Sequence, residues 1–246
     1  MTESRQAPAT AACDSSLVVR AGEAGLRYLE VAVEDLPDGA PLVVGLHGRG
    51  SSPEDFAGLA VELSPEWRYL FPRAPLPLDF GPYGSGYSWF EPLPAPPAAM
   101  ATARETLTSF LTKAHERYAV PPARTALLGF SQGAVMTLDV GLRAAAADQR
   151  YAALAAMSGY LAEADDLATI LADAAAQPLL LVHGTRDDVL GVALARRARR
   201  VLEDAGLSPE YREFDLAHEV SLESLATVRQ FLQRHIGPGD AREDQA

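Results

Sequence analysis

Two kinds of apolar pattern alternate along the chain. Short apolar runs that are mostly rich in leucine and valine predict strands at 17–20, 26–33, 41–47, 67–71, 125–130, 151–157, 178–184 and 210–214. Apolar residues at helical spacing predict helices at 53–62, 98–118, 132–147, 164–175, 191–205 and 219–235. Such an alternation of strands and helices is typical of an α/β fold.

The predicted strands differ in how continuous their apolar residues are. LRYLEVAV at 26–33 alternates apolar and polar positions, which is typical of an antiparallel edge strand. TALLGF at 125–130 and PLLLVHG at 178–184 are almost entirely apolar, as parallel strands buried on both faces are. We therefore predict a mostly parallel central sheet with helices on both faces. The segment 72–97 has neither period; it contains eight prolines and several aromatic residues, and we expect it to be a functional loop.

The composition is that of an ordinary globular domain. The chain has 246 residues, of which 48% are hydrophobic and 22% charged. We expect one α/β domain at 16–236 between disordered tails at 1–15 and 237–246. The net charge of -12 disfavours nucleic acid and anionic lipid surfaces as partners.

Other global features limit the classes of site and location. Cys13 is the single cysteine, which excludes an intrachain disulfide and a four-cysteine zinc site. No apolar run approaches the roughly 18 residues of a membrane span, and no signal-peptide pattern opens the chain. We expect a cytoplasmic protein.

The strongest chemical signal is the pentapeptide GFSQG at 129–133, which has the pattern G-x-S-x-G. A buried strand is predicted to end just before Ser131 and a helix to begin just after it, so the serine would occupy a sharp strand-to-helix turn. Flanking glycines allow such a turn to tighten. A helix-capping serine with glycines for packing is the alternative; the strand-turn-helix context favours a nucleophile.

A nucleophilic serine needs a base, and the base needs an orienting carboxylate. Asp187 and Asp188 follow one predicted strand, and His218 follows the last one. Open α/β sheets place their sites at these strand ends. The order serine, acid, histidine is that of α/β-hydrolases, and spacing alone leaves the choice between the two aspartates open. We interpret His47 and His183, which end apolar strands, as buried structural histidines.

Two backbone N-H groups are also needed to bind an oxyanion. Gln132 follows the nucleophile directly, and Arg49 lies in the glycine-flanked turn HGRGSS. A phosphate-binding loop is the competing interpretation of HGRGSS, but the G-K-[ST] ending is absent.

With these residues in place, the chain resembles the carboxylesterase and phospholipase family of α/β-hydrolases, relatives of the acyl-protein thioesterases. The resemblance spans roughly residues 40–235 and depends on LHGRG, FPRAP, YSWF, GFSQG, MSGYL, HGTRDD and AHEV in this order. It implies Ser131 as nucleophile, Asp187 as acid and His218 as base. It also implies the amides of Arg49 and Gln132 as the oxyanion hole. The loop at 72–97 and the absence of a proline soon after the acid depart from the family pattern and disfavour protein depalmitoylation.

The expected function is hydrolysis of a small carboxylic ester through an acyl-enzyme, with no metal and no cofactor. Tyr87, Trp89, Phe90 and Tyr160 are expected to bind the substrate. A lysophospholipase, thioesterase or lactone hydrolase on the same residues is the alternative, and a binding protein that lost turnover is a less favoured one. The sequence does not fix the oligomeric state, and a homodimer is one of the alternatives.

Overall fold

An eight-stranded mixed sheet forms the centre of the protein. The structure, a computed structural model, describes residues 17–174 and 176–237. The predicted N-terminal tail, Cys13 and nearly all of the predicted C-terminal tail lie outside these residues. Along the sheet the strands are β1 (Leu17–Glu23), β2 (Arg27–Val33), β4 (Arg68–Pro72), β3 (Leu42–Leu46), β7 (Thr125–Phe130), β8 (Ala153–Met157), β9 (Leu179–Gly184) and β10 (Glu210–Phe214).

The pairing confirms a mostly parallel sheet. From β4 to β10 every neighbouring pair is parallel, whereas β2 is antiparallel to both β1 and β4. The prediction that the strand at 26–33 is the edge strand is wrong, because β1 covers β2 on its outer side. Strand β1 is the edge strand instead. It has no fully buried residue, as expected for a strand at the edge of a sheet.

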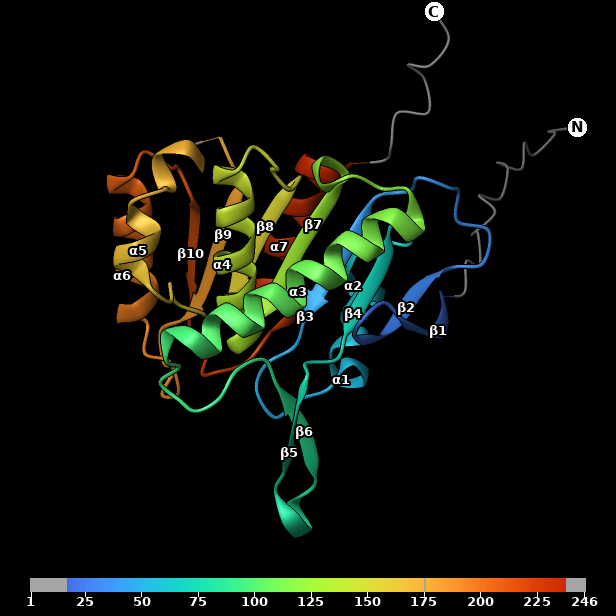
Figure 1. The fold of residues 1–246 in the computed structure, drawn as a ribbon, viewed down its shortest axis with the longest axis horizontal. Coiled ribbons are helices and arrows are strands. Elements are labelled where there is room, and N and C mark those ends of the chain that lie inside the picture. The colour runs from blue at the N-terminus through green and yellow to red at the C-terminus, as the bar shows by residue number, and fades with distance from the viewer. Residues whose placement is uncertain (1–16, 175, 238–246) are drawn as a thin grey trace, which may run out of the picture.

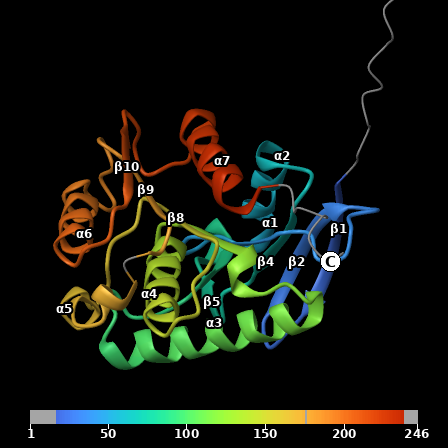
Figure 2. The ribbon, with the colours of Figure 1, turned by 90° about the horizontal axis from the view of Figure 1, so that it is seen from above.

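Helices cover both faces of the sheet, as predicted (Figure 2). Seen from above, α3, α4, α5 and α6 lie on one face, and α1, α2 and α7 lie on the other. Their bounds are α1 (Pro53–Ala57), α2 (Leu59–Leu63), α3 (Pro97–Tyr118), α4 (Gln132–Ala146), α5 (Ala164–Ala168), α6 (Ala193–Asp204) and α7 (Leu222–Ile236). The predicted helix at 53–62 is split at Gly58, and the one at 164–175 ends early, with a short 3-10 turn at Leu171–Ala174.

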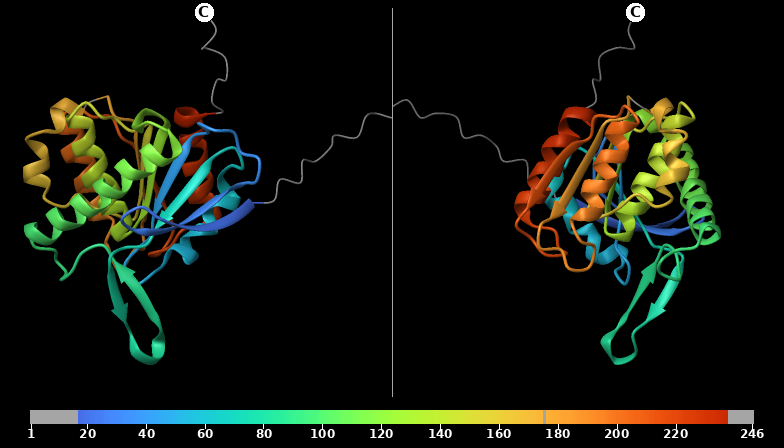
Figure 3. Two further views of the ribbon diagram at one scale, coloured as in Figure 1. Left: turned by 45° about the vertical axis from the view of Figure 1, so that its right-hand side comes forward. Right: turned by 90° about the vertical axis from the view of Figure 1, so that its left-hand side faces the viewer.

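A hairpin projects from the body of the molecule (Figures 1 and 3). It consists of β5 (Leu76–Asp79) and β6 (Ser85–Ser88), which pair antiparallel to each other. The prediction that 72–97 has no regular structure is therefore wrong for this part. Each strand has four residues and most are at least partly exposed, so neither has the apolar alternation that identifies a half-buried strand.

Helix α4 is the central helix of one face, and most of its residues are buried. It contains a carboxylate, Asp139, whose side chain is fully buried. Asp139 accepts hydrogen bonds from Arg104 Nε at 2.6 Å and from Arg143 Nε at 3.1 Å. Glu163, in the segment between β8 and α5, accepts from Arg104 at 2.7 Å. These charges join α3, α4 and the segment that follows β8.

Replacing Asp139 with alanine should lower the free energy of unfolding by about 3 kcal/mol, because it leaves two partly buried guanidinium groups without their central partner. Urea denaturation followed by circular dichroism measures this. Glu203→Ala, which removes the exposed Arg199–Glu203 pair, is the control and should cost at most about 0.5 kcal/mol. Equal effects of the two substitutions would contradict a structural role for the buried cluster.

Candidate active site

Ser131 lies at the junction between β7 and α4, on the edge of the sheet where the parallel strands end. Its backbone has φ 55° and ψ -119°, in a region that side-chain-bearing residues rarely occupy. Its N-H donates to the carbonyl of Met157 at the end of β8, at 2.9 Å. The residue is half-buried. The strand-to-helix turn predicted from the sequence is present.

Two glycines make this turn sterically feasible. A Cβ atom on Gly133 would lie 2.0 Å from the carbonyl oxygen of Leu46, and one on Gly129 would lie 2.2 Å from the carbonyl oxygen of Gly133. Both are backbone contacts that cannot move away cheaply. The first and last positions of the pentapeptide therefore need glycine because α4 starts in direct contact with β7 and the end of β3.

The structure brings Ser131, His218 and Asp187 together. His218 Nε2 lies 2.9 Å from Ser131 Oγ, and His218 Nδ1 lies 2.7 Å from Asp187 Oδ2. A carboxylate only accepts hydrogen bonds, so Nδ1 carries the imidazole proton and Nε2 can accept from the serine hydroxyl. The ring of Phe130 packs on His218 with 4.9 Å between centroids.

The carboxylate of Asp187 is buried and well hydrogen-bonded. Its Oδ1 accepts from the N-H groups of Leu190 at 2.7 Å and Val189 at 3.0 Å. Burial opposes ionisation, but the hydrogen bonds from His218 and from the backbone outweigh it and hold the pKa of Asp187 below its usual range. Asp188 is exposed, and of the two adjacent carboxylates it is Asp187 that lies against His218.

The loops that carry the acid and the histidine are held to each other. Thr185 N-H donates to the carbonyl of Phe214 at 2.8 Å, and Arg186 N-H donates to the carbonyl of Leu216 at 2.9 Å. Gly184, at the end of β9, permits this approach, because a Cβ atom there would lie 2.4 Å from the carbonyl oxygen of Leu216. The close spacing of Asp187 and His218 thus follows from the parallel pairing of β9 and β10.

The loop that contains Arg49 lies beside the same edge and is held by the hairpin. Gly50 N-H donates to the carbonyl of Tyr87 at 2.9 Å, and Tyr87 N-H donates to the carbonyl of Ser51 at 3.0 Å. A Cβ atom on Gly86 would lie 2.0 Å from the carbonyl oxygen of Gly50. Strand β6 therefore packs directly on this loop, a contact that the sequence analysis missed. The glycines at positions 50 and 86 were the sequence features that could have indicated this contact.

The side chain of Gln132 is a second feature that the sequence analysis missed. Its Oε1 accepts from Trp89 N-H at 2.7 Å, and its Nε2 donates to the carbonyl of Phe90 at 2.9 Å. The residue after the nucleophile thus joins α4 to the base of the hairpin. The ring of Trp89 extends this link by donating from Nε1 to the carbonyl of His47 at 2.9 Å.

His47 is buried and fully hydrogen-bonded, as predicted. Nδ1 donates to the carbonyl of Gly48 at 2.8 Å, and Nε2 accepts from Ala74 N-H at 3.1 Å. Burial lowers the pKa of His47, which keeps the ring in this neutral form. His183 is buried as predicted too, with 1% of its surface exposed, but it lies beside Asp187.

The four residues expected to bind substrate lie in two different settings. Trp89 and Phe90 are each 1% exposed and belong to the core, which argues against direct contact with a substrate. Tyr87 and Tyr160 are half-buried. Tyr160 lines a hollow of about 300 Å³ with apolar residues, among them Met100, Leu161 and Leu194, and with the charged residues Glu163 and Arg197.

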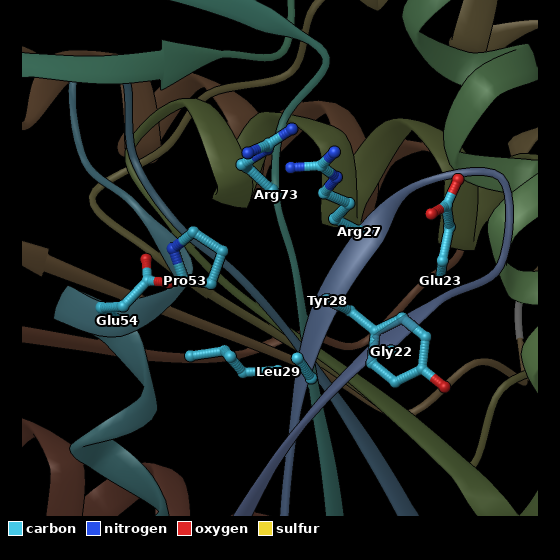
Figure 4. Close-up of a pocket in the computed structure, with 9 residues that line it drawn as sticks. Gly22, Glu23, Arg27, Tyr28, Leu29, Pro53, Glu54 and Arg73 are labelled. Atoms are coloured by element: carbon cyan, nitrogen blue, oxygen red, sulfur yellow. The ribbon is translucent and has the colours of Figure 1, made fainter.

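A different hollow, of about 560 Å³, lies beside β1 and β2 (Figure 4). Arg27 of β2 and Arg73, which directly follows β4, line it together with Glu23 and Glu54, and the close-up shows the two arginine side chains near each other. Ser131, Asp187 and His218 do not line it. Its mixed charges and exposed position make it a surface groove separate from the cluster around the serine.

The described residues contain neither a candidate metal site nor a helix that could span a membrane. No group of three or more histidine, cysteine, aspartate or glutamate side chains there is placed to hold a metal ion. None of the helices within 17–174 and 176–237 is both long enough and apolar enough to cross a membrane.

Several known proteins are similar to this chain. A probable carboxylesterase of Oryza sativa subsp. japonica is 26% identical over 217 residues, which are 82% of this chain and 80% of that protein. The crystal structure of esterase PE8 is 31% identical, with a TM-score of 0.71 over 83% of this chain and 95% of that one. Acyl-protein thioesterase 2 of Zea mays shares the fold, at 23% identity and a TM-score of 0.68, over 86% of this chain and 99% of its own.

The sequence profile of the phospholipase/carboxylesterase family matches residues 27–236, which is nearly the whole described structure. The esterase relatives, the mostly parallel sheet and the helices on its two faces agree with this match. The chain is a hydrolase with the α/β-hydrolase fold and belongs to the phospholipase/carboxylesterase family.

Proposed function

We propose that the protein hydrolyses carboxylic esters, with Ser131 as nucleophile, His218 as general base and Asp187 as the acid that orients the base. The observation that carries this proposal is the continuous pair of hydrogen bonds, 2.9 Å from Ser131 Oγ to the imidazole and 2.7 Å from the imidazole to Asp187. A serine hydroxyl is a weak nucleophile unless a base removes its proton, and this arrangement supplies that base.

The reaction proceeds in two similar halves. His218 Nε2 takes the hydroxyl proton while Ser131 Oγ attacks the acyl carbon, and the same proton is then donated to the leaving alcohol as the ester bond breaks. A water molecule repeats the attack on the acyl-enzyme and releases the carboxylic acid. Asp187 stabilises the imidazolium that forms in each half and keeps its Nδ1 protonated.

The negative charge on the tetrahedral intermediate needs donors that are already in place. We assign this role to the backbone N-H groups of Arg49 and Gln132. Neither group donates to a protein acceptor within the described residues. Gln132 is the first residue of α4, so its N-H has no partner inside the helix and lies at the positive end of the helix dipole. Donors fixed in this way lower the barrier because they need no reorganisation.

The substrate is proposed to be a small ester with an apolar acyl or alcohol group. We propose that this group occupies the hollow beside Tyr160, whose volume of about 300 Å³ is at the lower end of the usual range for small-molecule sites. Ser131 does not line this hollow, so the proposal requires the bound substrate to span the distance from the serine to it. Tyr87 is proposed as a further contact because β6 places it beside the loop that contains Arg49. Thioesters would react by the same steps, since only the leaving atom changes from oxygen to sulfur.

Replacing Ser131 with alanine should lower kcat on a p-nitrophenyl ester by at least about 10³-fold, because the attacking oxygen is gone. A fluorophosphonate probe should label the wild-type protein at Ser131 and should not label the variant. Circular dichroism checks that the variant is folded. A folded Ser131→Ala protein with near-wild-type turnover would refute the mechanism.

The two adjacent carboxylates should respond very differently to neutralisation. Asp187→Asn should lower kcat by about 10³- to 10⁴-fold, because an amide there favours the wrong imidazole tautomer. Asp188→Asn, the matched control, should cost less than about tenfold, since that side chain is exposed. Steady-state kinetics on purified variants measure both. If Asp188→Asn had the large effect and Asp187→Asn the small one, the acid would be Asp188. The assignment of Ser131 as nucleophile would not change.

Gly86→Ala tests the contact between the hairpin and the proposed oxyanion loop. The added methyl group would collide with the carbonyl of Gly50, displace the neighbouring N-H of Arg49 and lower kcat by about 10²-fold. Gly58→Ala is the control: a Cβ atom there meets no other atom within 4 Å, and kcat should stay unchanged. Equal kcat values for the two variants would show that β6 does not support catalysis.

A further inference from the structure

A second imidazole lies beside the proposed catalytic acid. His183 is the penultimate residue of β9, and its side chain is fully buried. Its Nε2 lies 2.6 Å from the carbonyl oxygen of Leu190 and 3.3 Å from Asp187 Oδ2. That oxygen is also the one bonded to His218. One carboxylate oxygen of Asp187 therefore has imidazole nitrogens from two different strand ends beside it.

The hydrogen-bond partners of His183 indicate which of its two ring nitrogens carries the hydrogen. A carbonyl oxygen only accepts hydrogen bonds, so Nε2 carries a proton and donates it towards Leu190. Nδ1 has no partner among the described residues, and a proton on that buried atom would be an unsatisfied donor. The neutral ring with its hydrogen on Nε2 satisfies these contacts. His183 thus supplies an N-H beside Asp187 without adding a positive charge to the site.

Thr185 and Arg186, before the acid, are bonded to the histidine loop, but the segment after the acid, residues 188–191, has few other supports. Asp188, Val189 and Gly191 are exposed, and 64% of the surface of Val189 is accessible. The N-H groups of Val189 and Leu190 bond to the carboxylate of Asp187 itself, so they close the loop on the acid and do not attach it to the sheet. In the described part of the chain, the bond from His183 to Leu190 is the hydrogen bond that joins residues 188–191 to a strand.

We propose that His183 is a positioning residue for the hydrolytic reaction. It acts through Asp187: its Nε2 holds the carbonyl of Leu190 and lies 3.3 Å from Oδ2, and in this way it fixes the position of the carboxylate that must meet His218. This inference depends on the proposed function, because it assigns His183 a role only if Asp187 is the triad acid. Within the described residues, His183 forms no hydrogen bond with Ser131 or His218.

The test uses three substitutions at position 183. His183→Phe keeps an aromatic ring and removes the N-H that donates to Leu190 and lies beside Asp187. His183→Gln places an amide nitrogen near the original Nε2, whereas His183→Asn is one carbon too short to reach Leu190. We expect kcat to fall about 10²-fold in the Phe and Asn variants with KM changed by less than about threefold, because a small misplacement of a catalytic group has an effect of that size. The Gln variant should stay within about tenfold of the wild type.

A proton NMR signal distinguishes positioning from general damage to the fold. The hydrogen between His218 Nδ1 and Asp187 should give a far-downfield resonance in the wild type, should persist in His183→Gln, and should be lost or shifted in His183→Asn. His115→Phe is the matched control: this histidine of α3 also has a buried ring nitrogen without a partner in the described residues. It should leave both the resonance and kcat unchanged.

The outcomes separate this inference from the function on which it depends. If the Gln and Asn variants have equal kcat values, or if a folded His183→Phe protein keeps the resonance and kcat within threefold, His183 does not position the acid, and the triad stands. If Asp187→Asn retains full activity, the assignment of Asp187 fails, and the role of His183 fails with it. The Gln and Asn comparison holds even if the Phe variant does not fold.

Discussion

The site depends on the backbone conformation of one residue, Ser131. A side-chain-bearing residue with positive φ at this turn costs about 1–3 kcal/mol, which the surrounding structure must offset. It does so by burying the helix that follows, by bonding the serine N-H to β8, and by bringing Gly133 against the end of β3. The strained turn places Oγ at the edge of the sheet, and the groups that would act with it must be brought there by neighbouring strands.

Parallel pairing brings those groups to the serine. The strands β3, β7, β9 and β10 all end at the same edge, so the segments that follow them meet there although they are far apart in the chain. The two halves of the site are stabilised differently. The half with Asp187 and His218 is held by backbone hydrogen bonds between loops, whereas the half with Arg49 is held by the hairpin and by the buried amide of Gln132.

This division changes the interpretation of the proline-rich segment. Its base, at Trp89 and Phe90, is part of the core and bonded to Gln132, so its aromatic residues support the nucleophile turn rather than line an open pocket. Its strands β5 and β6 project from the body. One segment therefore combines a buried base that is bonded to Gln132 with a projecting hairpin whose strand β6 packs on the loop containing Arg49.

Most of the fold was predictable because it follows local patterns. Continuous apolar runs identified the parallel strands, and the glycine-flanked serine between a strand and a helix identified the turn. What could not be predicted depends on distances between segments that are remote in the sequence. The hairpin has no apolar period, the contact between Gly86 and Gly50 joins two loops, and the position of His183 beside Asp187 depends on how residues 187–191 fold back over β9. A buried histidine at a strand end is compatible with packing alone. Only the position of its N-H, between a carbonyl and a carboxylate, connects it to the reaction.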